Sequence, residues 1–388
     1  MIKKILYIVR KDCYKIMGGD TIQIEKTKFY LNKKYHITVD IFEENKIHNL
    51  LIDDYDIIHI WGIKSEKDIH SLLQKAKSKK IGTITSTIYW NLEDTYFINT
   101  FYYFIWSDSK ILQLLKNTFI YFLSHVYYKI VPKYRNRQFN LPLCKTCKKA
   151  RQYTIKLSDI IIPNSDEEGK LLCQDIELDY KTVENKFISI PNAVDIEKLN
   201  VQCTNKILHN LSDFVIEAAG IEPLKNQLTI IRALINKPEI PIVFAGAIRN
   251  KKYFSCLQKL ANKRGNIFFT GKIEESQLFD LYKRAKVHVL PSFRESPGLV
   301  TIESLMNGAQ IVVSDKRFCP IQYYKFNKYG FICNPYDIRS IQKAILNAYN
   351  NPKDINLPED YYKFFSYDNV ADMTYKAYQK ALEIINER

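Results

Sequence analysis

The sequence contains 388 residues, and at about 150 residues per domain this length predicts two or three domains. Apolar residues make up 46% of the chain, enough for sizeable cores, which excludes an intrinsically disordered protein. Lysine and arginine number 57 against 42 acidic residues, so the net charge is +15. This excess indicates either an anionic partner or a composition that is rich in lysine throughout.

Targeting signals are the next feature that the sequence allows us to assess. The first apolar run, residues 5–9, ends at Arg10 and is too short for a signal peptide. A later apolar stretch, residues 111–131, is interrupted by charged and polar side chains, so no bilayer-spanning segment is predicted. We therefore expect a cytoplasmic protein whose eight cysteines are reduced thiols, and we exclude secreted, fibrous and integral-membrane classes.

Short apolar runs alternate with helical patterns in two successive halves of the chain. In the first half, strands are predicted at 4–9, 36–42, 56–62, 81–87 and 159–165, with helices over about 20–32 and up to about residue 79. In the second half, strands are predicted at 214–220, 240–246, 266–271, 286–292, 309–315 and 330–335. A last helix is predicted over about 369–386.

Runs of valine, isoleucine and phenylalanine that alternate with helices are typical of parallel sheets covered on both faces. The two halves therefore predict an α/β protein with two doubly wound, Rossmann-like domains that face a cleft. We place an N-terminal domain at 1–200 and a C-terminal domain at 201–365, because strand periodicity is lost between residues 192 and 213. The remaining segment, 366–388, is expected to pack back on the first domain.

A basic and aromatic region, about residues 96–157, departs from this pattern and predicts a helical insertion in the first domain. Between Ser109 and Ser158 there is no acidic residue, whereas eleven lysines and arginines fall there. Three interpretations are open: contact with a membrane or acceptor, a packed insertion with a solvated basic edge, or stacking on single-stranded nucleic acid. We favour them in that order, with the anionic membrane surface meeting Lys129, Lys133, Arg135 and Arg137.

The segment from Pro291 to Glu303 is the most informative motif. A predicted buried strand ends at Leu290, a polar turn with Glu295 follows, and a helix is predicted to open near Gly298. The amides of Gly298, Leu299 and Val300 would then lie at a helix N-terminus, which favours anions. Carboxylates on both sides of an anion site suit a ligand with hydroxyls at its ends and phosphates between them, such as a nucleotide sugar.

This segment resembles the Glu-x7-Glu signature of the family-4 (group 1) retaining glycosyltransferases, which have the two-domain GT-B fold. The rest of the chain is similar in order, and the similarity is more specific in the second half. The matching segments are the Gly18-Gly19 turn, Ile190–Asp195, Ala219–Asn226, Phe269–Gly271 and Gly308–Ser314.

The resemblance implies a role for each matching residue. Glu295 would hold sugar hydroxyls at the reacting end, and Lys225 would bind the diphosphate and stabilise the charge that develops on it. Glu303 would bind the ribose, and the turn at Gly271 and Lys272 would border the base. The remaining donor contacts would come from Gly18 and Gly19, whose backbone approaches the phosphates.

Two positions depart from the family pattern. The first residue of its Arg-x4-Lys segment is Gly220 here, so half of the cationic clamp is missing, and Arg294 or Arg249 are the candidates to replace it. The histidine that many relatives place after the fourth strand is also missing, and Thr87, Tyr89 or Asn91 are the polar residues nearby. These departures leave open a relative that binds without catalysis.

Other chemistries are less well supported. Cys144 and Cys147 have the spacing of metal ligands, but a single pair supplies only half of a zinc site, and no metal or other cofactor is expected. Neither a phosphate-binding P-loop motif nor a Gly-x-Gly-x2-Gly motif occurs, which argues against ATPases and NAD enzymes. His59 either faces the cleft or lies hydrogen-bonded in the core.

We expect a retaining transferase that moves a sugar from a nucleotide-diphosphate donor to a hydroxyl of a lipid-linked, polysaccharide or other cell-envelope acceptor. Its partners would be the nucleotide sugar, the glycan acceptor and an anionic membrane surface at the inner face of the cytoplasmic membrane. The alternative is an inactive, glycosyltransferase-like binding subunit. The sugar, the base and the acceptor are not encoded in any motif.

Overall fold

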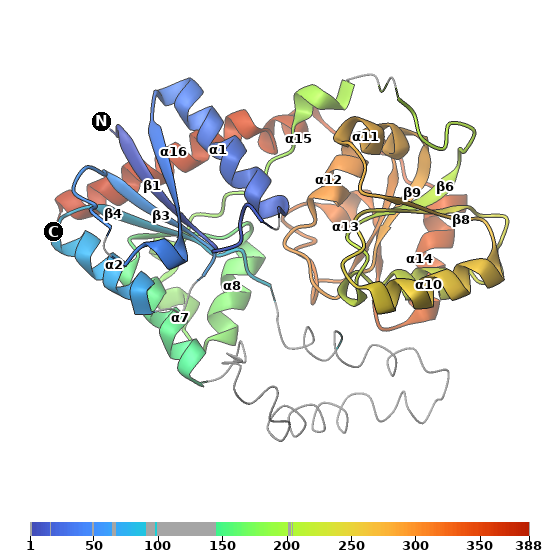
Figure 1. The fold of residues 1–388 in the computed structure, drawn as a ribbon, viewed down its shortest axis with the longest axis horizontal. Coiled ribbons are helices and arrows are strands. Elements are labelled where there is room, and N and C mark those ends of the chain that lie inside the picture. Colours follow the sequence, from blue (N-terminus) through green and yellow to red (C-terminus); the bar gives the residue numbers. More distant parts are fainter. Residues whose placement is uncertain are drawn as a thin grey trace. The chain divides into compact units, whose positions relative to one another are not determined.

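The computed structural model describes residues 2–15, 17–48, 50–63, 67–90, 98, 145–200, 203 and 205–387. These residues form two compact units, which Figure 1 shows coloured along the sequence. Unit 1 comprises the described residues up to 90, residues 145–196 and residues 358–387, and unit 2 comprises those from 197 to 357 together with residue 98. After residue 196 the chain therefore leaves unit 1, forms unit 2 and returns to unit 1 at residue 358.

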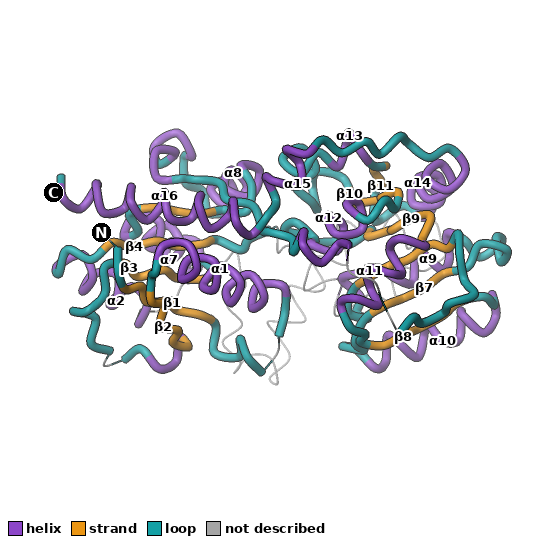
Figure 2. The backbone as a smooth tube through the Cα atoms, turned by 90° about the horizontal axis from the view of Figure 1, so that it is seen from above, coloured by secondary structure: helices purple, strands orange, loops and turns teal. Residues whose placement is uncertain are grey.

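Unit 1 contains a five-stranded parallel sheet in the order β2-β1-β3-β4-β5. Its strands are β1 (Lys4–Val9), β2 (Thr38–Glu43), β3 (Ile57–Trp61), β4 (Gly82–Ser86) and β5 (Ile160–Ile162). Alternate residues of a strand point to opposite faces of its sheet, so apolar residues along all of β1 require cover on both faces. Helices provide that cover, as Figure 2 shows.

The two faces of this sheet carry separate hydrophobic clusters. Ile5, Tyr7 and Val9 of β1 pack on α1 (Gly19–Tyr35) and α16 (Tyr367–Asn386). Leu6 and Ile8 belong to the cluster of α2 (Lys67–Ser78), which packs on α7 (Lys145–Leu157). Unit 1 also contains α8 (Asp166–Asp175), α15 (Glu359–Phe364) and the 3-10 turns η1 (Glu44–Lys46), η2 (Tyr180–Thr182) and η3 (Glu184–Lys186).

Unit 2 contains a six-stranded parallel sheet in the order β11-β10-β9-β6-β7-β8. Its strands are β6 (Phe214–Ala218), β7 (Ile242–Ala245), β8 (Ile267–Gly271), β9 (Ala285–Leu290), β10 (Gln310–Ser314) and β11 (Phe331–Cys333). The helices are α9 (Gln227–Ala233), α10 (Lys251–Arg264), α11 (Glu275–Arg284), α12 (Leu299–Met306), α13 (Phe326–Tyr329) and α14 (Ile338–Asn350), with 3-10 turns η4 (Ile196–Asn200) and η5 (Pro223–Lys225).

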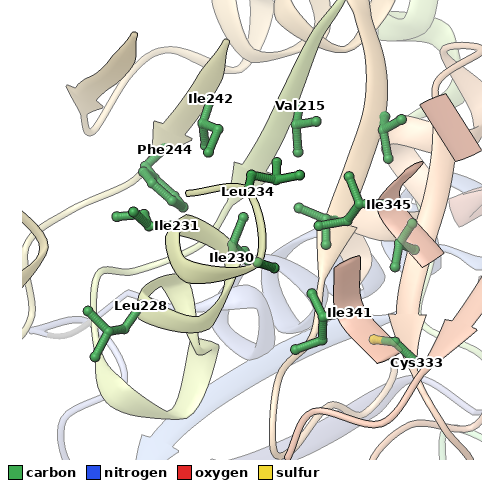
Figure 3. Close-up of a cluster of buried hydrophobic side chains, with 14 of the residues drawn as sticks. Val215, Leu228, Ile230, Ile231, Leu234, Ile242, Phe244, Cys333, Ile341 and Ile345 are labelled. Atoms are coloured by element: carbon green, nitrogen blue, oxygen red, sulfur yellow. The ribbon is translucent and has the colours of Figure 1, made fainter. Parts of the chain in front are cut away.

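The main core of unit 2 lies between the sheet and α9, α10 and α14. Figure 3 shows Val215, Ile242 and Phe244 of the strands with side chains of α9 and α14 around them. On the other face, α11 contacts β6 and β9, and α12 contacts β9 and β10. This packing fixes the loops at the carboxyl ends of the strands, where α9, α10 and α12 begin.

The fold class predicted from the sequence is confirmed, because both sheets are parallel and helices cover each of them. Residues 145–157 form α7, the helix that leads into β5, so this end of the expected insertion is a regular crossover of the first sheet. The rest of the region, including Lys129, Lys133, Arg135 and Arg137, lies outside the described residues. Within the described ranges, no helix combines the length and apolar character that a bilayer crossing requires.

Candidate active site

The switch point of the second sheet is where a doubly wound fold binds its ligands. The chain runs outward from β6 to β7 and β8, then crosses back to β9 on the other side of β6. Three neighbouring loops therefore meet at this edge: 219–226 after β6, 246–250 after β7, and 291–298 after β9. The residues with the strongest sequence signals lie on the first and third of these loops.

Asn226 holds the first and third loops together. Its side chain is fully buried, and Nδ2 donates hydrogen bonds to the carbonyls of Pro291 at 3.0 Å and Pro335 at 2.9 Å. The amide of Phe293 also donates to the carbonyl of Leu224 at 3.0 Å. Because backbone groups on both loops are bonded across the gap, the side chains that these loops carry have fixed positions.

Lys225 and Glu295 form an ion pair between the two loops. Lys225 Nζ donates to Glu295 Oε1 at 2.5 Å, and the side chains are 21% and 9% exposed. The other carboxylate oxygen of Glu295 faces Gly298, where an added Cβ would lie 3.3 Å from Oε2. Gly298 also has a φ of 80°, a conformation that other residues adopt only with strain. The structure therefore brings three of the predicted site residues together.

Glu303 lies on α12, the helix that Gly298 precedes and that Leu299 and Val300 open. Burial, reinforced by the negative charge of Glu275, raises the pKa of Glu303 to about 7, while Lys198 opposes this shift. Lys198 and Glu275 themselves form an ion pair. Glu303 is consequently divided between its neutral and ionised forms near neutral pH.

The remaining predicted residues of unit 2 lie on the same edge or beside it. Gly271 ends β8, and its carbonyl accepts from the amide of Gly246 at 2.9 Å, which joins it to the loop after β7. Lys272 follows and is exposed. Arg294 lies beside Glu295 in the loop after β9 and is partly buried.

Gly18 and Gly19 lie in unit 1, at the corresponding switch point of the first sheet, between β1 and β3. Gly19 begins α1 and Gly18 is its N-cap. Arg10, at the end of β1, donates through Nε to Asp20 at 2.7 Å and through Nη1 to Asp12 at 2.7 Å. The turn is therefore tied to the end of the first strand by charged hydrogen bonds.

Glu217 is a residue of this region that the sequence reasoning missed. It lies in β6 and is 1% exposed, and burial raises its pKa well above the usual range. The positive charge of Lys225 opposes this rise and the negative charge of Glu295 adds to it, so the three groups are electrostatically coupled. An acid inside the apolar run Phe214–Ala218 was the signal available in the sequence.

Several other candidates have structural roles. His59 is buried, with Nδ1 2.8 Å from Tyr378 Oη and Nε2 2.8 Å from Ser86 Oγ, and burial lowers its pKa to about 3. Thr87 donates to buried Glu168, which also accepts from the amide of Tyr89 at 2.9 Å. Asn91 and Cys144 lie outside the described residues, and in the part of the chain that is described no three potential metal ligands gather.

Comparison with known proteins agrees with this architecture. Residues 207–364 match the family model described as glycosyl transferases group 1. An uncharacterised glycosyltransferase of Methanocaldococcus jannaschii is 27% identical over 216 residues, 48% of this chain and 50% of that protein. A serotype-specific mannosyltransferase of Escherichia coli is 25% identical over 179 residues, 42% of this chain and 22% of the other. The chain thus spans about half the length, or less, of the curated relatives it matches.

Solved structures match over nearly the entire chain. A sucrose-phosphate synthase from Thermosynechococcus elongatus gives a TM-score of 0.68 at 15% identity and covers 100% of both chains. An Anabaena protein in complex with UDP and glucose gives 0.61 at 15% identity, over 99% of this chain and 97% of that one. At such identities the likeness establishes the GT-B fold, and the family model adds the sequence evidence in unit 2. Residues 207–364 of the chain are thus similar to the glycosyl transferases group 1.

Proposed function

We propose that the protein is a retaining glycosyltransferase that takes a sugar from a nucleotide-diphosphate donor bound mainly by unit 2. The observation that carries this proposal is the Lys225–Glu295 pair at the switch point of the second sheet. A lysine ammonium has three donors, and Glu295 occupies one of them. The other two are available to phosphate oxygens, so the carboxylate orients the cation that the diphosphate needs.

The proposed reaction exchanges one bond for another at the sugar's anomeric carbon. The bond to the terminal phosphate oxygen breaks, and its electron pair leaves with the diphosphate. An acceptor hydroxyl oxygen forms the new bond on the same face of the sugar, and its proton passes to the departing diphosphate. Lys225 and the first-turn amides of α12 stabilise the charge that develops on the leaving group, and Glu295 accepts hydrogen bonds from sugar hydroxyls.

The acceptor in this proposal is a lipid-linked or polysaccharide glycan of the cell envelope. Support comes from the names of two relatives, a serotype-specific mannosyltransferase of Escherichia coli and an O-antigen chain mannosyltransferase of Salmonella typhimurium. In this scheme Gly271 and Lys272 border the base. The ribose hydroxyls bind Glu303.

Ligand binding tests the donor site directly. We would measure melting temperatures at low salt with UDP, GDP, ADP, CMP and their sugar conjugates. A ligand that binds only the folded state raises stability by RT ln(1 + [L]/Kd), so we expect one nucleoside diphosphate to raise the melting temperature selectively. With that donor, Lys225→Ala and Glu295→Gln should each lower transfer by about 100-fold or more, the loss typical when one such stabilising group is removed.

Lys259→Ala is the matched control, because Lys259 is an exposed lysine of α10 in the same unit. It should leave both binding and transfer unchanged. Full activity in Lys225→Ala would contradict the assignment of the donor site. Selective nucleotide binding without transfer to any acceptor would instead favour the inactive binding subunit.

A further inference from the structure

Gly220 and Arg249 lie on two neighbouring loops, and the side chain of Arg249 is packed against the Cα of Gly220. Gly220 follows β6, and a Cβ built on it would lie 2.6 Å from Nε, 2.7 Å from Cδ and 3.1 Å from Cζ of Arg249. Contacts below about 3 Å are far inside van der Waals separation for carbon. The guanidinium of Arg249 therefore fills the space into which a side chain at position 220 would project, and glycine is the residue that leaves it room.

Backbone hydrogen bonds fix the position of Arg249 beside Gly220. Ile221 and Ile248 form an isolated parallel β-bridge between the loops after β6 and β7. The carbonyl of Ile221 accepts from the amides of Arg249 at 3.2 Å and Asn250 at 3.1 Å, and the amide of Ile221 donates to the carbonyl of Ala247 at 2.9 Å. The two loops are thus joined on both sides of Arg249, so the position of its Cα is set by the sheet edge.

The side chain of Arg249 is held by an ion pair and remains exposed to water. Its Nη1 donates to Glu222 Oε1 at 3.0 Å, and 49% of the side chain is exposed. A guanidinium has five N–H donors, and this contact uses one of them. The remaining fork can bind an oxyanion through two parallel hydrogen bonds, a geometry that suits phosphate.

We propose that Arg249 is the second cation of the diphosphate site, supplied by the loop after β7 in the space that Gly220 leaves. The loop 219–226 carries Gly220 at one end and Lys225 at the other, so the guanidinium and the ammonium flank the same segment of backbone. The inference rests on the proposed function, and it assigns a substrate-binding residue that lies outside the motif. The loop after β7 thereby supplies the positive charge that the family pattern places at position 220.

Arg249→Ala tests the proposal, with UDP, GDP and ADP as probes measured by calorimetry on the full chain. The diphosphate that binds the wild-type protein should bind Arg249→Ala about tenfold or more weakly, because a charge-assisted pair of hydrogen bonds is lost. Affinity for the corresponding nucleoside, which lacks phosphates, should be the same in both proteins. Arg249→Lys should recover only part of the loss, since an ammonium cannot form the bidentate contact.

Glu222→Gln separates phosphate binding from a purely structural role. This variant removes the ion pair and keeps the guanidinium, so diphosphate affinity should stay the same or rise. If Arg249 merely joins the loops through Glu222, then Glu222→Gln should weaken binding as much as Arg249→Ala does, and the proposal is overturned. Melting temperatures of all variants show whether each one folds.

Moving the positive charge from position 249, in the loop after β7, to position 220, in the loop after β6, provides the sharpest test. Gly220→Arg alone should weaken diphosphate binding, because its side chain collides with the guanidinium already present. The double variant Gly220→Arg, Arg249→Ala should restore affinity to within a few-fold of wild type, whereas Gly220→Ala, Arg249→Ala should not. Failure of the double variant to exceed Arg249→Ala would overturn the proposal.

The two proposals fail in different ways. If no nucleoside diphosphate binds the wild-type protein, the proposed function fails before any variant is compared. If a diphosphate binds and responds to Lys225→Ala but not to Arg249→Ala, the proposed function stands and the role of Arg249 is wrong.

Discussion

Unit 2 contains two acids with raised pKa values, the buried Glu217 and the partly buried Glu303. Burial is the largest cause of the raised pKa in both, and like charges nearby add to it. An acid whose pKa is higher in the folded state than in the unfolded chain takes up protons on folding. Such a group destabilises the folded protein wherever the unfolded chain is already ionised, which makes stability depend on pH.

Glu303→Gln should therefore change the pH dependence of unfolding. The pKa of Glu303 is about 7 in the folded protein, against an ordinary value of 4.5. The wild-type free energy of unfolding should fall as pH rises between these values, whereas glutamine has no proton to lose. Urea unfolding between about pH 5 and about pH 8 should show an advantage of Glu303→Gln that grows with pH and levels off above about pH 7.

Glu275→Gln is the companion measurement for this prediction. Glu275 contributes to the raised pKa of Glu303, so its removal should shrink the pH window in which stability changes. A stability difference between wild type and Glu303→Gln that is constant across the whole range would mean that Glu303 titrates as an ordinary surface acid.

The helix α16 is attached to the first sheet by a buried chain of hydrogen bonds. Tyr378 Oη lies 2.9 Å from Tyr7 Oη of β1 and 2.8 Å from Nδ1 of His59 in β3. The other nitrogen of His59 is 2.8 Å from Ser86 Oγ of β4. One hydroxyl on the helix thus satisfies polar groups on two strands that have no access to water.

Tyr378→Phe should lower the free energy of unfolding by about 1 to 3 kcal/mol, the usual range when a buried partner is left unsatisfied. Chemical denaturation of the full chain measures this loss. Tyr375→Phe, on the same helix, is the control, because its ring keeps the stack on Tyr35 and little change is expected. Equal losses in the two variants would show that the hydrogen-bond chain contributes nothing specific.

Helices and strands followed from the sequence more reliably than the site did. The strand Lys4–Val9 has the predicted bounds, and α16 begins two residues before the predicted helix, because the apolar pattern of each segment reflects which of its side chains are buried. The pairing of Lys225 with Glu295 depends on strand order, which no local pattern contains. The same holds for Arg249, whose approach to Gly220 follows from the pairing of β6 with β7.

The two units build their hydrophobic cores from different stretches of the sequence. The hydrophobic cluster of α1 and α16 includes Tyr367, Val370, Ala371, Ala377, Tyr378 and Ala381, all from the returning segment. The main cluster of unit 2 contains no described residue beyond 357. Unit 1 therefore depends on residues that follow unit 2, whereas the main core of unit 2 does not.

A chain that stops after Leu357 should consequently retain one ordered unit and lose the other. Hydrogen exchange should show protected amides in β6 and β9, as in the full chain, and rapid exchange in β1 and β3. The physical reason is that one face of the first sheet loses α16, one of the two helices that cover it, and exposes apolar side chains to water. Persisting protection in β1 would show that α16 is dispensable for the fold of unit 1.

The late return of the chain to unit 1 also has a consequence for biosynthesis. At about 5 to 20 residues per second, α16 is synthesised roughly 10 to 40 s after residue 196 has been added. During that time the nascent sheet of unit 1 presents the face around Ile5, Tyr7 and Val9 without α16, one of the two helices that cover it. Unit 2 can complete its main core within this interval, so of the two units the one that begins earlier in the chain finishes folding later.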